Sequence, residues 1–512
     1  MTIETVLPQA RVDLMAPLVE RLAEAFARND IVYCHWKSNI HLAEAAAGEQ
    51  DLDLLVDRRC LAQALAVLSA TGFKPAVARW GPNAPGITHY YGFDETTEEL
   101  VHVHLFSALL TGESYVKSHL FPFEGLLLQN THFYGPLRVT NRQAELVLFT
   151  LRAFVKYGSL PDLLHLWRKT ASLKREVTWL EEGGNREAAL SLLATYCPVV
   201  EKGLFVDCLD AVSGDSSLIT RILLARRVRR RLKVYVRHGF WGRVARYAQL
   251  LFAEVSRRVG TKRKNKALRA GGAVIAFVGA EATGKSTLVA ETVRWLGGTF
   301  AVSTVHAGKP PATLLTAPVS LLLPALRRRL SSFRTNKLEG HSGAGASPSS
   351  PDEIKGIASL VYAARAVILA WERRQLLLTA RRAAANGDLV ICDRYPSDTV
   401  GAMDSPRLRE QQKANGIVPA LVNGFARLEG RLYQQIAPPD IVLRLNVTIE
   451  TAQRRNRERA KVGKEGDAYV ASRHRHAREW QNSGTKFVYD IDTEQSLPQT
   501  IHCVKKAIWE CL

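Results

Sequence analysis

The feature that most constrains the fold is a glycine-rich loop at residues 279–286, which reads Gly-Ala-Glu-Ala-Thr-Gly-Lys-Ser. An apolar run before it predicts a buried strand, and the residues after it predict a helix. Glycines let backbone N–H groups curl around a polyphosphate, and the helix N-terminus adds the positive end of a dipole. Lys285 can reach the β- and γ-phosphates, and the Ser286 hydroxyl can ligate Mg²⁺. The strand–loop–helix context favours a nucleoside triphosphate site over a turn that binds nothing.

Length and composition bound the class of protein. The 512 residues are too many for one core, so we expect two to four domains. No run of about 18 apolar residues predicts a membrane span, and the N-terminus lacks the pattern of a secretion signal. Seven scattered cysteines without a Cys-x-x-Cys pair indicate reduced thiols and predict no zinc site. We expect a cytoplasmic protein, with peripheral attachment to the inner face of a membrane as the alternative.

Three regions differ in hydrophobic patterning and predict an α/β protein of three domains. Residues 1–140 mix helical and strand periodicity, as an α+β domain does. Residues 141–270 are mainly helical and end in a basic connector. Residues 271–512 alternate strands and helices, which predicts a parallel sheet. Its strands are expected at 273–278, 300–306, 389–392, 440–445 and 487–491.

Two further groups in the C-terminal region carry charges that suit phosphate chemistry. Asp393 ends an apolar strand, where a carboxylate can organise Mg²⁺, and Arg394 beside it can hold an anionic substrate group. Arg455, Arg457 and Arg459 stand at every second residue, which suits a mobile lid that closes on transferring phosphates. The alternatives are a structural ion pair for Asp393 and a solvated basic helix face for the arginines.

The order of these motifs resembles thymidylate kinase over residues 271–512. The pattern runs from Gly-x-Glu-x-x-Gly-Lys-Ser-Thr through Asp-Arg-Tyr and Arg-x-Arg-x-Arg to Asp-Ile-Asp-Thr at 490–493. The resemblance implies a P-loop nucleoside-monophosphate-kinase fold, a five-stranded parallel sheet, and Mg-ATP as the phosphate donor. It implies metal binding by Ser286 and Asp393, and catalysis by Lys285, Asp393, Arg394 and the three lid arginines. The ATP-binding residues it implies are Gly279, Ala280, Glu281, Ala282, Thr283, Gly284, Lys285, Ser286 and Thr287, and the acceptor-binding residues are Glu281, Arg373, Arg394 and Tyr395.

The chain also departs from this family. Ala282 stands where one subtype carries a loop arginine, so the chain resembles the lid-arginine subtype. The second strand ends in His-Ala-Gly-Lys-Pro-Pro at 306–311, where the family usually has Arg-Glu-Pro-Gly-Gly. Arg373 lies one residue from the place of the base-contacting arginine, and the insert at 312–352 is unusual. These differences concern acceptor recognition, so the sequence predicts phosphotransfer from ATP and leaves the acceptor open.

The N-terminal region carries two aspartates, Asp51 and Asp53, on an expected strand. The period of two points both to one face, where they can ligate one Mg²⁺. Lys37 and Ser38, in a polar turn upstream, could hold a triphosphate. The arrangement resembles the nucleotidyltransferase superfamily, and implies that fold and two-metal nucleotide transfer. The strand expected to carry a third carboxylate reads Val-His-Val-His at 101–104. The sequence therefore leaves open whether the nucleotidyltransferase activity of this domain is present, altered or lost.

Most of the net charge of +20 lies in one segment. Residues 221–269 hold 17 Lys/Arg against one acid, with aromatic residues among the arginines. Such a segment can lie on an anionic membrane, grip nucleic acid, or dock domains through an apolar stripe packed inward. Nucleic acid is the least favoured of the three. A nucleotide or phosphorylated small-molecule acceptor is the remaining partner expected. A homodimer is compatible with the sequence, which leaves the oligomeric state open.

Three functions are compatible with these motifs. The first is a kinase that moves the γ-phosphate of Mg-ATP to dTMP or a related nucleoside monophosphate, with nucleotidyl transfer in the N-terminal head. The second is a kinase or nucleotidyltransferase acting on a phosphorylated sugar or glycan precursor. The third is an ATP-regulated adaptor on a membrane or nucleic acid, without catalysis. Asp393, Arg394 and the lid arginines argue against the third, because an ATP binder needs none of them.

Overall fold

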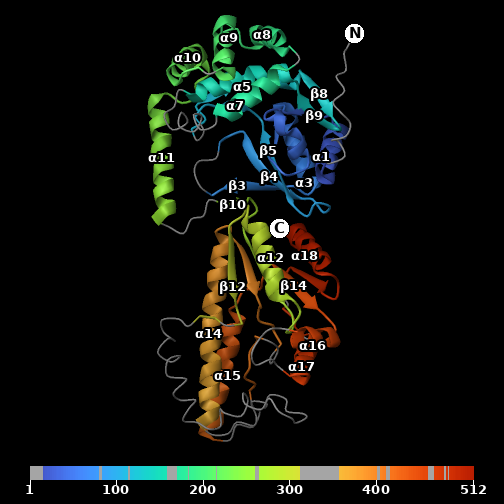
Figure 1. The fold of residues 1–512 in the computed structure, drawn as a ribbon. Coiled ribbons are helices and arrows are strands. Elements are labelled where there is room, and N and C mark those ends of the chain that lie inside the picture. Colours follow the sequence, from blue (N-terminus) through green and yellow to red (C-terminus); the bar gives the residue numbers. More distant parts are fainter. Residues whose placement is uncertain are drawn as a thin grey trace. The chain divides into compact units, whose positions relative to one another are not determined.

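The chain divides into two compact units, Met1–Arg269 and Ala270–Leu512 (Figure 1). The predicted insert at 312–352 and Arg459 fall outside the described residues of this computed structural model. It describes residues 15–79, 84–113, 116–157, 170–182, 184–214, 216–259, 265–308, 310–311, 357–399, 404–410, 416–458, 466–477, 480–482 and 484–512.

An eight-stranded mixed sheet organises the first unit, in the order β10-β3-β4-β5-β2-β1-β9-β8. The pairs β2–β5 and β1–β9 are parallel and the other neighbours are antiparallel. A separate hairpin joins Leu109–Thr111 (β6) and His119–Phe121 (β7). The strands of the large sheet are Tyr33–His35 (β1), Leu52–Val56 (β2), Lys74–Ala78 (β3), Ile87–Phe93 (β4), Leu100–Phe106 (β5), Thr131–Tyr134 (β8), Leu137–Thr140 (β9) and Lys266–Leu268 (β10).

This sheet separates two hydrophobic cores, because neighbouring residues of a strand point to opposite faces. Tyr33 and Leu54 belong to the core that includes Pro17–Arg28 (α1) and Leu61–Ala70 (α3). Cys34 and Leu55 belong to the core on the other face, together with the helices that follow the sheet. The remaining helices of the unit are Leu42–Ala46 (α2), Glu124–Leu128 (α4), Arg142–Tyr157 (α5), Thr170–Glu181 (α7), Asn185–Tyr196 (α8), Lys202–Ser213 (α9), Leu218–Arg231 (α10) and Phe240–Val259 (α11).

The region predicted as a separate helical domain, 141–270, packs into the first unit as far as Arg269. Helices α5 and α7 to α10 share one continuous core with β1, β2 and β5. The reason is that α5 is apolar on more than one side, so it contacts the later helices and its buried residues also share a core with the strands. The basic connector therefore belongs to the first unit.

One buried acid of α5 gives the first unit a predicted pH dependence. Glu145 is 3% exposed and accepts hydrogen bonds from the backbone N and from Nδ2 of Asn39, at 3.2 and 2.7 Å. Burial raises the pKa of Glu145 from 4.5 to about 7. Between these values the unfolded chain releases a proton that the folded chain keeps, so stability falls as pH rises through this window.

We expect Glu145→Gln to remove this part of the pH dependence. At roughly 1.4 kcal/mol per pKa unit, the wild-type chain loses about 3 kcal/mol of unfolding free energy between pH 4.5 and 7 from this group. Urea unfolding of both proteins at pH 5 and pH 8 measures the difference. Glu182→Gln, at an exposed position, is the control. Equal pH dependence in wild type and Glu145→Gln would contradict the prediction.

The second unit is built on a five-stranded sheet in which all neighbours are parallel, in the order β12-β13-β11-β14-β15. This confirms the predicted sheet. Its strands are Ala273–Val278 (β11), Val302–His306 (β12), Leu389–Asp393 (β13), Ile441–Asn446 (β14) and Phe487–Asp492 (β15). Strand β11, in the middle, is buried at every position, as expected when helices cover both faces.

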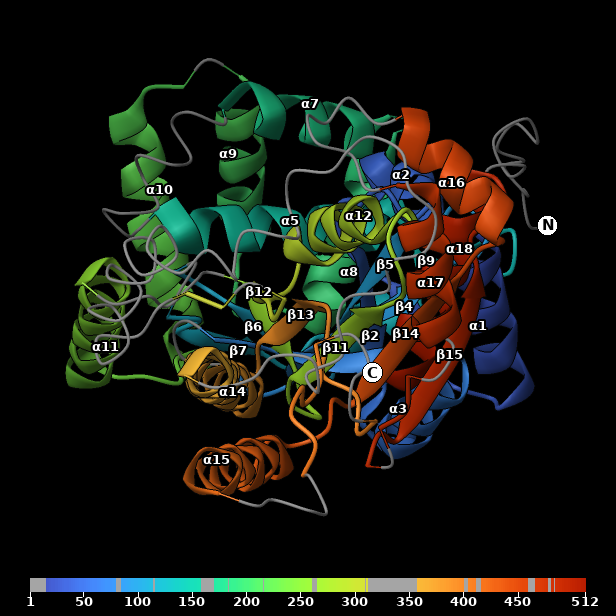
Figure 2. The same ribbon diagram turned by 90° about the horizontal axis from the view of Figure 1, so that it is seen from below.

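Helices cover this sheet on two sides (Figure 2). Alternate residues of β11, starting with Val274, pack against the long helix Ile357–Ala385 (α14) through Leu377 and its neighbours. Trp295 of Lys285–Gly297 (α12) meets Trp509 of Leu497–Cys511 (α18), with ring centroids 6.4 Å apart. The remaining helices are Ile417–Gln434 (α15), Ile449–Glu458 (α16) and Asp467–Ala477 (α17). Within the described residues, no helix is both long enough and apolar enough to cross a membrane.

Candidate functional site

The glycine-rich loop joins β11 to α12, and three of its residues have positive φ: Gly279 at 151°, Ala282 at 63° and Gly284 at 84°. A Cβ on Gly279 would lie 2.8 Å from the carbonyl oxygen of Leu445, so this position requires glycine. Thr283 Oγ1 donates to the carbonyl of Ala280 at 3.0 Å and closes the loop. Ser286 and Thr287, in the first turn of α12, are exposed and open to a ligand.

Lys285 lies folded over this loop. Its Nζ donates to the carbonyls of Gly279 and Ala280 at 2.9 and 2.5 Å, and lies 3.3 Å from Thr283 Oγ1. The ammonium group therefore lies against the loop, within reach of a phosphate that the loop would bind. Sheet order and loop geometry together give Ala270–Leu512 a P-loop kinase-like fold.

Asp393 ends β13, next to the loop strand: its register partner on β11 is Phe277, immediately before Val278 and the loop. Its Oδ2 lies 3.4 Å from His306 Nδ1, and its Oδ1 is buried without a hydrogen-bond partner among the described residues. A buried carboxylate oxygen without a partner costs free energy, which a bound cation or its water would offset. The oxygen donor set of Asp393 and the exposed Ser286 hydroxyl thus fits Mg²⁺.

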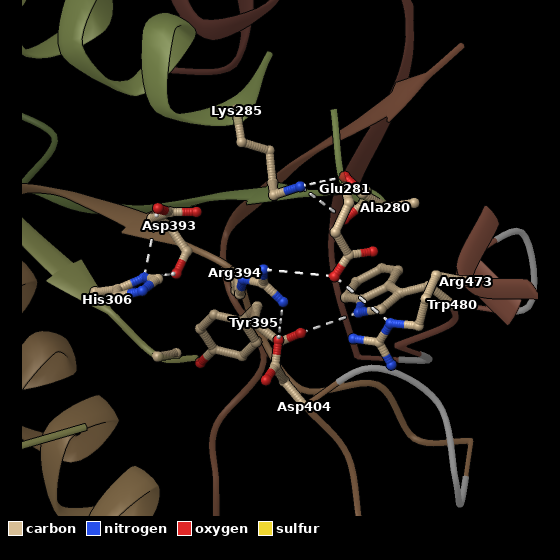
Figure 3. A network of polar contacts seen from close by, with 12 residues as sticks. Ala280, Glu281, Lys285, His306, Asp393, Arg394, Tyr395, Asp404, Arg473 and Trp480 are labelled. Carbon is tan, nitrogen blue, oxygen red and sulfur yellow. Dashed lines mark hydrogen bonds and ion pairs between the residues drawn. The ribbon is translucent and has the colours of Figure 1, made fainter. Parts of the chain in front are cut away.

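Arg394 stands at the centre of a charged network (Figure 3). Its Nη1 lies 3.3 Å from Asp404 Oδ2 and its Nη2 3.9 Å from Glu281 Oε1. Glu281 Oε1 also lies 3.5 Å from Nε of Arg473 on α17. A Cβ on Gly308 would lie 2.6 Å from Arg394 Cδ, so glycine at this position leaves room for the arginine.

Sequence reasoning missed His306, Asp404 and Arg473 as members of this network. They lie far apart in the chain, on β12, in a loop after β13 and on α17, and only His306 belongs to a segment that the sequence singled out, the altered end of the second strand. The histidine beside Arg473, His474, contacts the loop as well, with its Nε2 2.8 Å from the backbone oxygen of Glu281. For Arg473 and His474, the one sequence signal of a role at the loop was the basic run that contains both.

Arg373 and Tyr395, predicted to bind the acceptor, are both buried. Arg373 is 1% exposed and is held by Asp404 Oδ1 at 2.7 Å, Tyr433 Oη at 2.7 Å and the carbonyl of Ala307 at 3.0 Å. Tyr395 Oη donates to the carbonyl of Ala437 at 2.5 Å, and burial raises the pKa of this phenol. Arg373 thus fixes Asp404, which in turn orients Arg394. Direct acceptor contact by Arg373 stays a prediction.

The lid arginines Arg455 and Arg457 each contact a different neighbouring segment of the second unit. Arg455 Nη2 donates to the carbonyl of Thr493 at 2.7 Å, after β15. Arg457 Nε lies 3.4 Å from Asp467 Oδ2 at the start of α17. These contacts join α16 to the sheet and to the helix that carries Arg473. Their role on transferring phosphates stays a prediction.

Two cavities adjoin the network. One of about 360 Å³ is lined by the loop residues Gly279 and Ala280, by His474, and by the ion pair of Arg444 with Asp490 at 2.6 Å. The other, of about 820 Å³, begins at Tyr395. Its lining continues through Pro396, Ser397 and Asp398, and includes Leu408, Arg409, Glu410 and, on α15, Gly430, Tyr433 and Gln434.

In the first unit, Asp51 and Asp53 lie together as predicted, but cationic and imidazole groups already contact them. Lys37 Nζ lies 2.7 Å from Asp53 Oδ1, and His104 Nδ1 lies 3.2 Å from the same oxygen. Burial opposes ionisation of Asp53, yet Lys37 and His104 hold its pKa below the ordinary value. Ser38 has a left-handed φ of 59° and begins a short turn. Lys37 is thus engaged by Asp53, and its role in holding a triphosphate stays a prediction.

The third carboxylate of the predicted nucleotidyltransferase site is not found in this cluster within the described residues. Asp53 faces His104 in the strand register. Asp94, a nearby acid in the sequence, is used elsewhere: its Oδ2 accepts from the backbone N of Leu18 at 2.7 Å and its Oδ1 from Thr96 and Thr97. Two-metal nucleotide transfer by this unit stays a prediction.

Comparison with known proteins gives little beyond this geometry. No protein-family model matches the chain, and no curated protein matches it. Among solved structures, the chain is similar to a deoxyadenosine kinase from M. mycoides with bound dATP, at 17% identity and a TM-score of 0.26, over 46% of this chain and 98% of that one. The P-loop kinase-like fold assigned to Ala270–Leu512 rests on the sheet order and the loop of the chain itself.

Proposed function

We propose that the second unit transfers the γ-phosphate of Mg-ATP to dTMP or a related nucleoside monophosphate. The observation that carries this proposal is the placement of two charged motifs on adjacent parallel strands. Lys285 follows β11, and Asp393 with Arg394 ends β13, at the same edge of the sheet. A site that only bound ATP would have no use for the Arg394 network beside the loop.

Under this proposal, the residues of the site have the following roles in the transfer. Loop N–H groups and Lys285 hold the β- and γ-phosphates, once Lys285 leaves the carbonyls it now contacts. Ser286 and Asp393 would hold Mg²⁺, which would supply positive charge against the negative charge of the transferring phosphate. Arg394, between Glu281 and Asp404, positions the anionic group of the acceptor for in-line attack. The cavity that begins at Tyr395 is the acceptor pocket under this proposal.

ADP release from Mg-ATP across a panel of acceptors tests this function, with Lys285→Ala as the blank. The panel holds dTMP, other nucleoside monophosphates, and phosphorylated sugars. Release that depends on a nucleoside monophosphate supports the proposal. Release that depends only on a sugar phosphate would replace the acceptor class. ATP binding without release for any acceptor would favour the regulatory adaptor and reject the kinase.

We further propose that residues 218–259 attach the first unit to an anionic membrane surface. Helix α11 lies at the edge of its unit (Figures 1 and 2), and its Trp241 and Phe252 are 79% and 75% exposed. At 3.6 residues per turn, its exposed apolar residues fall within an arc of about 100°. The exposure of these residues supports attachment over the inward-packed stripe considered from the sequence. The exposed large apolar residues of the segment are Leu218, Ile219, Leu223, Val234, Val236, Trp241, Val244, Leu251, Phe252 and Val255.

The positive charge of this segment favours an anionic lipid surface as the binding partner of its exposed apolar residues. Residues 221–269 carry a net +16, from 17 Lys/Arg and one acid. Exposed arginines such as Arg226 and Arg230 stand beside the apolar residues, a combination typical of helices that lie in a membrane interface. Each basic residue near such a surface contributes about 1 kcal/mol.

Sedimentation with vesicles tests the attachment, using phosphatidylserine-containing and purely zwitterionic vesicles. We expect pelleting only with the anionic vesicles, weakened by salt, and reduced at least tenfold in a Trp241→Ser/Phe252→Ser double variant. Phe133→Ser, which removes an aromatic residue 64% exposed elsewhere in the unit, is the matched control. Absence of lipid-dependent pelleting would overturn the proposal. So would a dimer in solution that the double variant dissociates, because a second copy would then cover this face.

A further inference from the structure

Three histidines converge on one face of the first unit's sheet. Antiparallel pairing of β4 with β5 sets His89 opposite His104 and Tyr91 opposite His102. Parallel pairing of β2 with β5 sets Asp53 beside His104. Alternate strand residues share a face, so the imidazoles and the carboxylates of Asp51 and Asp53 form one cluster.

The spacing of the imidazoles suits a single small cation. Each histidine offers one ring nitrogen, and these nitrogens lie within 4.8 Å of one another. His89 Nδ1 and His102 Nε2 are 3.1 Å apart. Two nitrogens on a tetrahedral zinc ion, at about 2.0–2.1 Å from the metal, would lie about 3.4 Å apart. The nitrogens of His89 and His102 would therefore have to separate by only a few tenths of an ångström to share the ion, and the ligand nitrogen of His104 lies within 4.8 Å of both.

The two aspartates orient these rings. Asp51 Oδ1 lies 2.5 Å from His102 Nδ1, on the opposite side of the ring from the nitrogen that faces His89. Asp53 Oδ1 lies 3.2 Å from His104 Nδ1. A carboxylate on the second nitrogen of a histidine is the usual arrangement around bound zinc, because it fixes the tautomer and orients the ring.

We propose that His89, His102 and His104 bind one divalent transition-metal ion of the zinc type, with Asp51 and Asp53 orienting His102 and His104. Imidazole nitrogen selects such ions over Mg²⁺, which takes oxygen ligands. The sequence-based prediction of no zinc site considered only cysteines, and the sequence-based role of Asp51 and Asp53 as Mg²⁺ ligands changes under this proposal. Three protein ligands leave a fourth position, as in zinc sites that hold a water or a substrate.

Lys266 on β10 competes for the same nitrogen. Its Nζ lies 3.4 Å from His102 Nε2 and donates to the Tyr91 hydroxyl. An ion at His102 displaces this ammonium, and the long lysine side chain can swing aside. Replacing Lys266 by methionine is therefore expected to strengthen metal binding, a gain that a variant with a damaged fold would not show.

Titration of the metal-stripped full chain with Zn²⁺, followed by calorimetry, tests the proposal. We expect one equivalent bound, at least 100-fold weaker affinity in His104→Ala, tighter affinity in Lys266→Met, and no displacement by millimolar Mg²⁺. His132→Ala, a half-buried histidine bonded to Asn141 in the same unit, is the matched control. Co²⁺ absorption separates this site from the cysteines, since thiolate ligands add a strong near-ultraviolet band.

Three results would overturn the metal site: unchanged affinity in His104→Ala, a thiolate band for the bound Co²⁺, or equal competition by Mg²⁺. The kinase proposal is unaffected by any of them, because ADP release from the second unit is measured separately.

Discussion

Replacing Lys285 with alanine is expected to lower turnover of Mg-ATP by about 100- to 1,000-fold. The ammonium group of Lys285 donates to two loop carbonyls, 2.9 and 2.5 Å away. Alanine leaves the negative charge of the β- and γ-phosphates without this partner in the transition state, where it matters most. Steady-state ADP release with saturating acceptor measures the loss.

The matched control for this variant is Lys486→Ala, an exposed lysine of the same unit. Thermal unfolding of all three proteins shows whether the fold survives, and we expect similar midpoints. Turnover within a few fold of wild type in a folded Lys285→Ala protein would remove the loop from the catalytic site.

Replacing Asp393 with asparagine is expected to lower turnover by about 100-fold and to raise the Mg²⁺ concentration needed for half-maximal rate. Asparagine has the same shape, so its contact with His306 and the end of β13 can be kept. What it loses is the negative charge on a buried oxygen that has no hydrogen-bond partner among the described residues. Rates measured over a range of Mg²⁺ at fixed ATP show both effects.

Asp388→Asn is the control, because Asp388 immediately precedes β13, at the opposite end of the strand. It is expected to keep the Mg²⁺ dependence of wild type. If Asp393→Asn slowed turnover while leaving the Mg²⁺ dependence unchanged, Asp393 would act through His306 or Arg394 and not through a metal.

Prediction from sequence succeeded where local signals decide the structure. The apolar strands of the second unit, its loop and its parallel sheet follow from periodicity and from glycine at required positions such as Gly279. The pairing of Asp51 with Asp53 on one face follows from the period of a strand. Contacts between distant segments could not be predicted: Arg394 meets Asp404 and Glu281 only because three loops converge at one sheet edge.

The sequence by itself determined a phosphate-binding loop, an aspartate–arginine pair at a strand end, and a basic segment with aromatic residues. The tertiary structure alone decided which partners these groups have. It buried Arg373 on Asp404, exposed the apolar stripe of α11, and set His102 between His89 and Asp51. The physical reason is that a strand's period fixes the face of each side chain, whereas the order and register of strands, set by packing of the whole core, fix its neighbours.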